Sequence, residues 1–366
     1  MKSARIISTG MAVPDCVVDN HLLSRCMSTS DEWIVKRTGI RERRVSPDTY
    51  RMLLRLAEAP DKAAYMAEVR ERGLDGDIDS SLMVSDLGLE ASRMALKNAG
   101  MRAEDLDCII NAYTLSDFAY PATGCVLQGK LGLTTTPVFN LQQGCAGFVY
   151  GLALGDQLIR GGMYGRILVV GAELLSSAFD YTDAGRDMAV LFADGAGAVV
   201  LQAEAADPAR PRGLISHHLH SDGTVLDGLS GEICGSSTFP MVSKKKIDDG
   251  RTRPRMNGRA VFAQAVRRVR EVLEECLEAN GLKSSDVDLY LFHQANLRIV
   301  ESVAGHFQIP AQRAYNNIGR YGNTAAASVP ICLHEAWSDG RIKDGDLVML
   351  VAFGTGFSWG ATLLRW

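Results

Sequence analysis

Residues 98–111 read NAGMRAEDLDCIIN, and residues 279–292 read ANGLKSSDVDLYLF. Each stretch has the glycine that often ends a helix, then a short acidic turn, then an apolar strand. Three positions keep the same residue at a constant offset of 181: Gly100 and Gly281, Asp105 and Asp286, and Asp107 and Asp288. The chain therefore repeats one helix–turn–strand unit.

The repeat continues in the later strands. The apolar run 167–171 has a counterpart at 347–351, and residues 193–201 are similar to residues 357–364. An offset near half of the 366 residues indicates a duplicated α/β unit rather than a solenoid of short repeats. Apolar strands that alternate with amphipathic helices predict sheets covered by helices on both faces.

The duplication also predicts the domains. We expect an N-terminal half over residues 1–204 and a C-terminal half over residues 213–366. The stretch Glu204–Arg212, which contains two prolines, is expected to join them.

Composition excludes several classes of function. A net charge of −4 and a pI near 6.0 argue against binding to nucleic acid or to an anionic membrane. No apolar run approaches the roughly 20 residues that span a bilayer, and the start of the chain turns polar too early for a signal peptide. We therefore expect a cytoplasmic protein. Its 8 cysteines form no C-x-x-C pair, which indicates reduced thiols.

Cys145 is the cysteine with the strongest indication of chemistry. It lies in the sequence Gln-Gly-Cys-Ala-Gly, between a β-rich run at 137–141 and a helical pattern at 146–160. Free backbone N–H groups and the positive end of a helix dipole at such a corner stabilise a thiolate, the nucleophilic form. We expect Cys145 to be a nucleophile.

His293 and Asn323 are its candidate partners. His293 directly follows a strand, and Asn323 lies in a glycine-containing loop before a helical segment. Both belong to the second half, whereas Cys145 belongs to the first. A pseudo-twofold arrangement of the halves would bring the three corners together.

Several motifs in order along the chain resemble those of β-ketoacyl-acyl-carrier-protein synthase III. Besides the Cys145 corner, they are TSDEWI at 29–34, RTGIRER at 37–43, DGAGA at 194–198, HQANLRI at 293–299, YGNT at 321–324 and GFSWG at 356–360. The resemblance implies the thiolase fold, with duplicated α/β halves in a five-layered α-β-α-β-α stack. It also implies a homodimer that condenses an acyl-CoA with malonyl-acyl-carrier protein, with loss of CO₂, in fatty acid or related biosynthesis.

The resemblance assigns roles to the trio. Cys145 would carry the acyl group, and His293 and Asn323 would donate hydrogen bonds to the enolate left by decarboxylation. The backbone N–H groups of Cys145 and Thr355 would form the oxyanion hole. Threonine at 355 stands where the family often has glycine, and it fits if its φ is negative. No cofactor and no metal are implied.

Binding residues also follow from the resemblance. Trp33 would stack on the CoA adenine, with Arg37 and Arg186 near the nucleotide. Arg298, Asn296 and Phe262 would contact CoA or the carrier protein, and Tyr120 would gate the acyl pocket from the partner subunit.

Two further segments invite a functional reading. His217, His218 and His220 lack a carboxylate or cysteine at close spacing, so we expect no metal there.

Residues 47–82 have no counterpart in the compact family pattern and predict two short helices, Met52–Leu56 and Ala63–Arg72. This insertion is either surface decoration or a lid or dimer extension near the substrate entrance.

Other reactions use the same nucleophile. An acyl-CoA-dependent acyltransferase, or an enzyme that joins two acyl-CoAs head to head, would also need Cys145. A carrier-protein-binding scaffold would not need the full trio. The presence of both His293 and Asn323 favours decarboxylation, because simple acyl transfer needs no enolate donors. The length of the acyl chain is left open.

Overall fold

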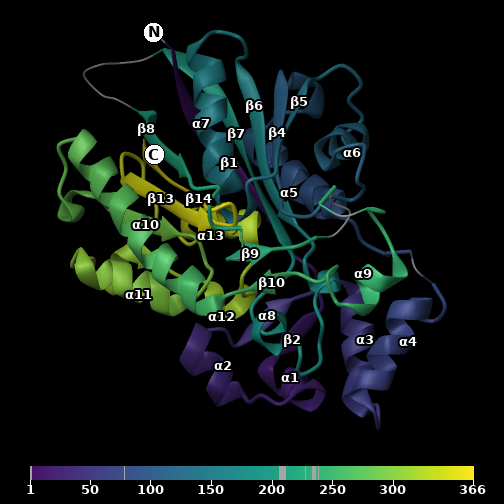
Figure 1. Ribbon diagram of the computed structural model, residues 1–366. Coiled ribbons are helices and arrows are strands. Elements are labelled where there is room, and N and C mark those ends of the chain that lie inside the picture. Colours follow the sequence, from purple (N-terminus) through teal and green to yellow (C-terminus); the bar gives the residue numbers. More distant parts are fainter. Residues whose placement is uncertain (1, 78, 206–211, 227, 233–235, 238) are drawn as a thin grey trace.

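The computed structural model describes residues 2–77, 79–205, 212–226, 228–232, 236–237 and 239–366. Two five-stranded sheets form its framework (Figure 1). The first has the order β1 (Lys2–Ala12), β7 (Gly195–Ala205), β6 (Arg166–Glu173), β4 (Cys108–Ala112) and β5 (Val138–Leu141). The second has the order β8 (Gly213–Ser221), β14 (Ser358–Arg365), β13 (Leu347–Gly354), β11 (Leu289–Phe292) and β12 (Ala314–Tyr315).

The two sheets have the same topology. In each, the two strands at one end run parallel to the third, and the last two pairings are antiparallel. The predicted duplication is confirmed, because β4 and β11 are the strands of the two repeated sequence stretches.

Helices form three layers around the two sheets. The first sheet is covered on its outer face by α5 (Val84–Ala99) and α6 (Thr123–Lys130), and the second by α10 (Gly258–Ala279) and α11 (Leu297–His306). Between the sheets lie α7 (Gly147–Arg160) and α13 (Ser328–Ser338), each in contact with strands of both sheets. Both are rich in buried residues, as expected of helices without a solvent face. The predicted α-β-α-β-α stack is confirmed.

Short elements surround the end of the molecule away from both termini (Figure 1). They are β2 (Val17–Asp19), α1 (Asn20–Cys26), α2 (Asp31–Thr38), β3 (Glu42–Arg44), α8 (Arg186–Ala189), β9 (Leu229–Ser230), α9 (Lys244–Asp248), β10 (Arg255–Met256) and α12 (Ile318–Tyr321). Single 3₁₀ turns occur at Ala103–Asp105, Gly144–Ala146, Ser176–Ala178, Ser284–Asp286, Ala311–Arg313 and Ala325–Ala327.

The insertion forms two helices, α3 (Pro47–Glu58) and α4 (Lys62–Arg72). The first is longer than predicted, because Ser46 caps its N-terminus and Pro47 occupies its first turn, both strong start signals. Leu53, Leu56 and Met66 are buried against the α1–α2 region. The helices are therefore packed onto the body of the protein.

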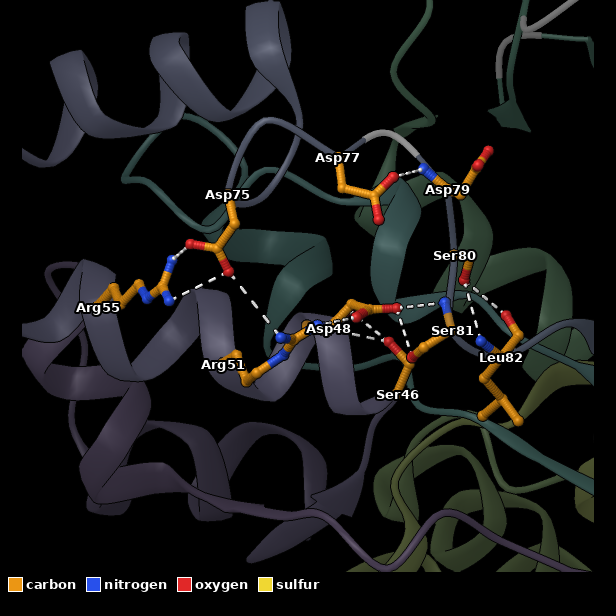
Figure 2. A network of polar contacts seen from close by, with 11 residues as sticks. Ser46, Asp48, Arg51, Arg55, Asp75, Asp77, Asp79, Ser80, Ser81 and Leu82 are labelled. Carbon is orange, nitrogen blue, oxygen red and sulfur yellow. Dashed lines mark hydrogen bonds and ion pairs between the residues drawn. The ribbon is translucent and has the colours of Figure 1, made fainter.

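The end of the insertion is tied back to its start (Figure 2). Asp48, in the first turn of α3, accepts hydrogen bonds from the backbone N–H and the hydroxyl of Ser81, at 2.8 and 2.7 Å. Arg55 pairs with Asp75 between these points. The insertion is a closed excursion from the chain, which explains how the surrounding fold accommodates it.

The domain boundaries stay a prediction. Residues 206–211 of the expected linker Glu204–Arg212 lie outside the described residues, and the strands on either side of the linker, β7 and β8, belong to different sheets. Within the described ranges, every helix is too short or too polar to cross a membrane.

Candidate active site

Cys145 lies in the turn Gly144–Ala146, directly before α7, and is 6% exposed. The end of β13 packs closely against it. A Cβ on Gly354 would lie 2.7 Å from the backbone nitrogen of Cys145, and one on Gly144 would lie 2.5 Å from Cγ2 of Thr355. Gly144 also has a φ of +50°, so side chains are excluded there both by space and by conformation.

Thr355 has the negative φ that a threonine at this position requires. The described residues other than glycine with positive φ are Asp75, Gln308 and Ala325, so Thr355 keeps a backbone that threonine adopts readily. Its hydroxyl donates to the carbonyl of Leu229 at 2.7 Å, which fastens the loop to β9. The side chain is thereby held while the backbone lies beside Cys145.

The thiol of Cys145 differs from the expectation. Burial raises the pKa of Cys145 to about 12, with a smaller contribution to that shift from the nearby carboxyl of Glu173. The prediction that the helix start yields a stabilised thiolate is wrong, because desolvation outweighs the effect of the helix end. With this pKa, the thiol is protonated near pH 7.

Asn323 is held by its backbone and by its side-chain oxygen. Its N–H donates to the carbonyl of Leu191 at 2.9 Å, and its carbonyl accepts from Ala193 N–H at 2.9 Å. The side-chain oxygen accepts from the N–H of Ala325 at 2.9 Å. The amide is therefore oriented, and within the part of the chain that the structure describes its NH₂ group stays available to donate to a ligand.

His293 follows β11 and contacts Ser328 at the start of α13. Its Nδ1 lies 2.5 Å from Oγ of Ser328, and the backbone N–H of Gln294 donates to the same oxygen at 3.4 Å. Within the described ranges these are the two contacts of the Ser328 hydroxyl. If Nδ1 of His293 also donated a hydrogen bond to the Ser328 oxygen, the hydroxyl hydrogen of Ser328 would be buried without an acceptor. Ser328 therefore donates to Nδ1, and Nε2 of His293 carries the ring proton.

The charge of His293 is fixed by its surroundings. The residue is buried, and burial lowers the pKa of His293 to about 3. The ring is thus neutral near pH 7 and donates through Nε2 without adding a positive charge.

The predicted trio comes from adjoining turns of the two halves. The turn that holds Cys145 contacts the turn Ala325–Ala327, which lies between Asn323 and Ser328 in the chain. Ala325 belongs to the same buried cluster as Cys145. The pseudo-twofold convergence expected from the repeat is therefore seen for Cys145 and the Asn323 loop, with His293 hydrogen-bonded to Ser328 at the end of that loop.

Sequence reasoning missed two residues at this site, Ser328 and Glu173. Glu173 ends β6 and is fully buried, and it accepts from the Thr114 hydroxyl at 2.7 Å and from Ala326 N–H at 3.2 Å. It thereby links the two halves beside Cys145. Burial raises the pKa of Glu173 to about 7, against the opposing effect of its hydrogen bonds. The available signal was an acidic residue directly after a run of apolar strand residues.

A second group of predicted residues gathers around Trp33 on α2. The guanidinium of Arg37 lies 4.4 Å from the indole centroid, and that of Arg186 lies 5.0 Å away. Arg186 also donates to the carbonyl of Ser28 at 2.9 Å. The structure thus brings one indole ring and two guanidinium groups together, a combination that suits a nucleotide.

The remaining predicted residues lie in three places. Arg298 lies over the ring of Phe262, 5.6 Å from its centroid, and Asn296 caps α11 by accepting from Arg298 N–H at 3.0 Å. Tyr120 is 86% exposed, so it does not line a pocket of its own chain. His218 and His220 both contact Glu275, and the described residues contain no group of three or more ligand types placed to hold a metal.

Comparison with known proteins identifies the family of the chain. Residues 139–223 match the family model "3-oxoacyl-[acyl-carrier-protein] synthase III", and residues 277–366 match the model of its C-terminal part. The chain is 40% identical over 361 residues to the β-ketoacyl-[acyl-carrier-protein] synthase III of Rhodospirillum centenum, covering 99% of this chain and 98% of that protein.

Solved structures extend the likeness to three dimensions. The 3-oxoacyl-(acyl carrier protein) synthase III of Pseudomonas aeruginosa is 34% identical, with a TM-score of 0.81 over 100% of this chain and 98% of that one. The enzyme of Thermus thermophilus is 35% identical, with a TM-score of 0.81 over 99% of each chain. The identity and coverage confirm the resemblance found in the motifs: this chain belongs to the β-ketoacyl-acyl-carrier-protein synthase III family.

Proposed function

We propose that this protein condenses an acyl-CoA with malonyl-acyl-carrier protein, with loss of CO₂, through an acyl thioester on Cys145. As a member of its family it is a condensing enzyme of the acyltransferase class that acts in fatty acid biosynthesis. The observation that carries the detailed proposal is the neutral His293, which offers an Nε2–H near the Asn323 loop and Cys145.

In the first step the sulfur of Cys145 attacks the thioester carbonyl of acyl-CoA. A carbon–sulfur bond forms to Cys145, the bond to the CoA sulfur breaks, and the thiol proton leaves with CoA. The N–H groups of Cys145 and Thr355 donate to the oxyanion that forms between these events. Because the thiol is protonated in the free enzyme, its ionisation is coupled to substrate binding.

In the second step malonyl thioester loses CO₂, and the electron pair of the broken carbon–carbon bond moves into an enolate. The Nε2–H of His293 and the NH₂ of Asn323 donate to its oxygen. Neutral donors suit this step, because they stabilise the enolate by hydrogen bonds without transferring a proton to it. The enolate carbon then attacks the acyl carbonyl, and Cys145 leaves as a thiolate.

Other surfaces receive the rest of the substrates. Trp33 would stack on the adenine of CoA, with Arg37 and Arg186 in contact with the nucleotide. Arg298, Asn296 and Phe262, at the start of α10 and α11, would contact the pantetheine arm or the acidic carrier protein. The exposed Tyr120 would reach the acyl pocket of the second subunit of a homodimer, and we place the enzyme in the cytoplasm.

The Ser328→Ala variant tests the tautomer of His293. Without the donated hydrogen bond, Nε2 no longer carries the proton in every molecule, so we expect CO₂ release to slow about tenfold. Acylation of Cys145 uses backbone donors and should change little. The measurement compares CO₂ release with the rate of acyl-enzyme formation; equal losses in both steps would indicate a merely structural role for Ser328.

The proposed reaction is tested on the unmodified protein in two stages. Intact-mass spectrometry after mixing with acyl-CoA should show the protein plus one acyl group. Addition of malonyl-acyl-carrier protein should then release CO₂ and return the protein to its original mass. Acylation without CO₂ release would indicate an acyltransferase. A condensation product formed from two acyl-CoA molecules alone would indicate a head-to-head condensing enzyme.

A further inference from the structure

Strand β6 of the first half meets the Asn323 loop of the second half with two residues on one face. Alternate residues of a strand point to the same side, so Gly171 and Glu173 face the same neighbours. A Cβ on Gly171 would collide with the carbonyl oxygen of Ala326, in the turn Ala325–Ala327. Glu173 accepts a hydrogen bond from the N–H of the same Ala326 at 3.2 Å. Close packing and a carboxylate therefore hold this turn against β6.

The carboxylate of Glu173 is itself fixed within the first half. Thr114, in the loop after β4, donates to it with its hydroxyl at 2.7 Å and with its backbone N–H at 3.1 Å. All the hydrogen bonds that Glu173 makes to described residues thus come from donors, which an ionised carboxylate accepts at both oxygens. Because the side chain is fully buried and charge-assisted hydrogen bonds are strong, Glu173 is a fixed acceptor for Ala326.

The turn that Glu173 holds also orients the amide of Asn323. Ala325 has a φ of +42°, in the left-handed region that alanine enters at a cost in free energy. Such a backbone persists only where its surroundings enforce it. The N–H of Ala325 donates to the side-chain oxygen of Asn323 at 2.9 Å, and this bond sets the direction of the amide. Relaxation of the turn would therefore move the NH₂ group of Asn323.

The charge of Glu173 does not help the first step of the reaction. Burial is the main cause of the raised pKa of Cys145, and the carboxyl of Glu173 adds to it. A neutral side chain at this position would remove that second contribution and favour the thiolate. The benefit of Glu173 is therefore to be sought in the second step, where the donors to the enolate must be correctly oriented.

We propose that Glu173 is a positioning residue for decarboxylation: its carboxylate holds the turn Ala325–Ala327 so that Asn323 presents its NH₂ group to the enolate oxygen. The inference rests on the proposed function. It adds a residue that touches neither the substrate nor the reacting atoms and acts through Asn323. Acylation of Cys145 relies on backbone N–H groups, so loss of the carboxylate should slow CO₂ release and leave acylation at least as fast.

The first test replaces Glu173 with glutamine, whose NH₂ group cannot accept the hydrogen bonds that one carboxylate oxygen accepts now. The assay is run above pH 7, because burial raises the pKa of Glu173 to about 7 and the carboxyl is ionised above that pH. We expect CO₂ release from malonyl-acyl-carrier protein, measured on the preformed acyl-enzyme, to fall about 10- to 100-fold. Acyl-enzyme formation, followed by intact-mass spectrometry on the same preparation, should be unchanged or faster.

A double variant distinguishes positioning from general support of the fold. If Glu173 acts through Asn323, its replacement should have no further effect on CO₂ release once Asn323 is alanine. The rate of Glu173→Gln/Asn323→Ala should then equal that of Asn323→Ala within about twofold. Losses that multiply in the double variant would overturn the inference, because Glu173 would then act independently of Asn323.

Asp156→Asn is the matched control for the loss of a buried charge. Asp156 is a buried carboxylate near the end of α7, about three helical turns from Cys145, and it pairs with Arg160 at 2.6 Å. Its replacement makes the same chemical change away from the Asn323 loop. The ratio of CO₂ release to acylation should therefore stay within about twofold of that in the unmodified protein.

Gly171→Ala displaces the same turn while Glu173 is unchanged, because its Cβ needs the space of the Ala326 carbonyl. It should also lower the ratio of CO₂ release to acylation, and it carries the test if Glu173→Gln does not fold. Thermal unfolding of each variant shows which of them are folded.

The outcomes separate this inference from the proposed function. If the unmodified protein released CO₂ but the folded Glu173→Gln and Gly171→Ala variants kept its ratio of the two rates, the inference would be overturned and the condensation would stand. Equal loss of both steps in folded Glu173→Gln, or a change in acylation alone, would also overturn it. No CO₂ release from the unmodified protein would overturn the proposed function and this inference with it.

Discussion

Replacing Cys145 with alanine is expected to abolish acylation of the protein by acyl-CoA. The serine, histidine and water of an active site do not replace a missing nucleophile, and loss of such a residue lowers turnover by on the order of 10⁴ or more. The measurement is intact-mass spectrometry in excess acyl-CoA, which should show the unmodified mass at all times. Condensation should be lost together with acylation, because the second step needs the acyl-enzyme.

Cys125 provides the control for this variant. It is an exposed free thiol on α6, so it is open to nonspecific transfer of an acyl group. Cys125→Ala should still be acylated once, at the same rate as the unmodified protein. A mass increase that persists in Cys145→Ala and disappears in Cys125→Ala would refute the assignment of the nucleophile.

Replacing Asn323 with alanine is expected to separate the two steps. Acylation of Cys145 should continue, because its oxyanion is held by backbone N–H groups. CO₂ release from malonyl-acyl-carrier protein should fall by about 10²- to 10³-fold, the usual effect of removing one donor to a developing oxyanion. The measurements are acyl-enzyme formation by mass and CO₂ release on the same preparation, so the acyl-enzyme should accumulate.

Asn316→Ala is the matched control for the Asn323 variant. Asn316 lies seven positions earlier and is exposed, and its side-chain oxygen accepts from the N–H of Ile318 at 3.0 Å, its one side-chain hydrogen bond among the described residues. Its loss should leave both steps within about twofold. If Asn323→Ala lost acylation and CO₂ release to the same extent, the residue would be structural, and the enolate would need another donor.

The sequence predicted the fold because the repeated unit is local. The glycine that ends each helix, the acidic turn and the following strand are all read within 14 residues, and the offset between the copies gives the second sheet from the first. The start of α3 was also local, in Ser46 and Pro47, but the prediction began at Met52 and passed over both signals.

The properties of the site depend on contacts that no local pattern contains. The corner predicted Cys145 as the candidate nucleophile, but its raised pKa comes from burial in the assembled fold and from Glu173. Ser328 gains its role only when α13 starts next to the end of β11. The role of Tyr120 stays a prediction, because it requires a second subunit.

The two central helices have a consequence for the integrity of the enzyme. Since α7 and α13 each contact both sheets, neither half can cover its own central helix, and a separated half would expose an apolar surface to water. We therefore expect the two halves to depend on each other for stability, so that a fragment with Cys145 or with His293 alone would lack both a covered core and an assembled site. The two halves are copies of each other in sequence, but we expect each to depend on the other for its stability.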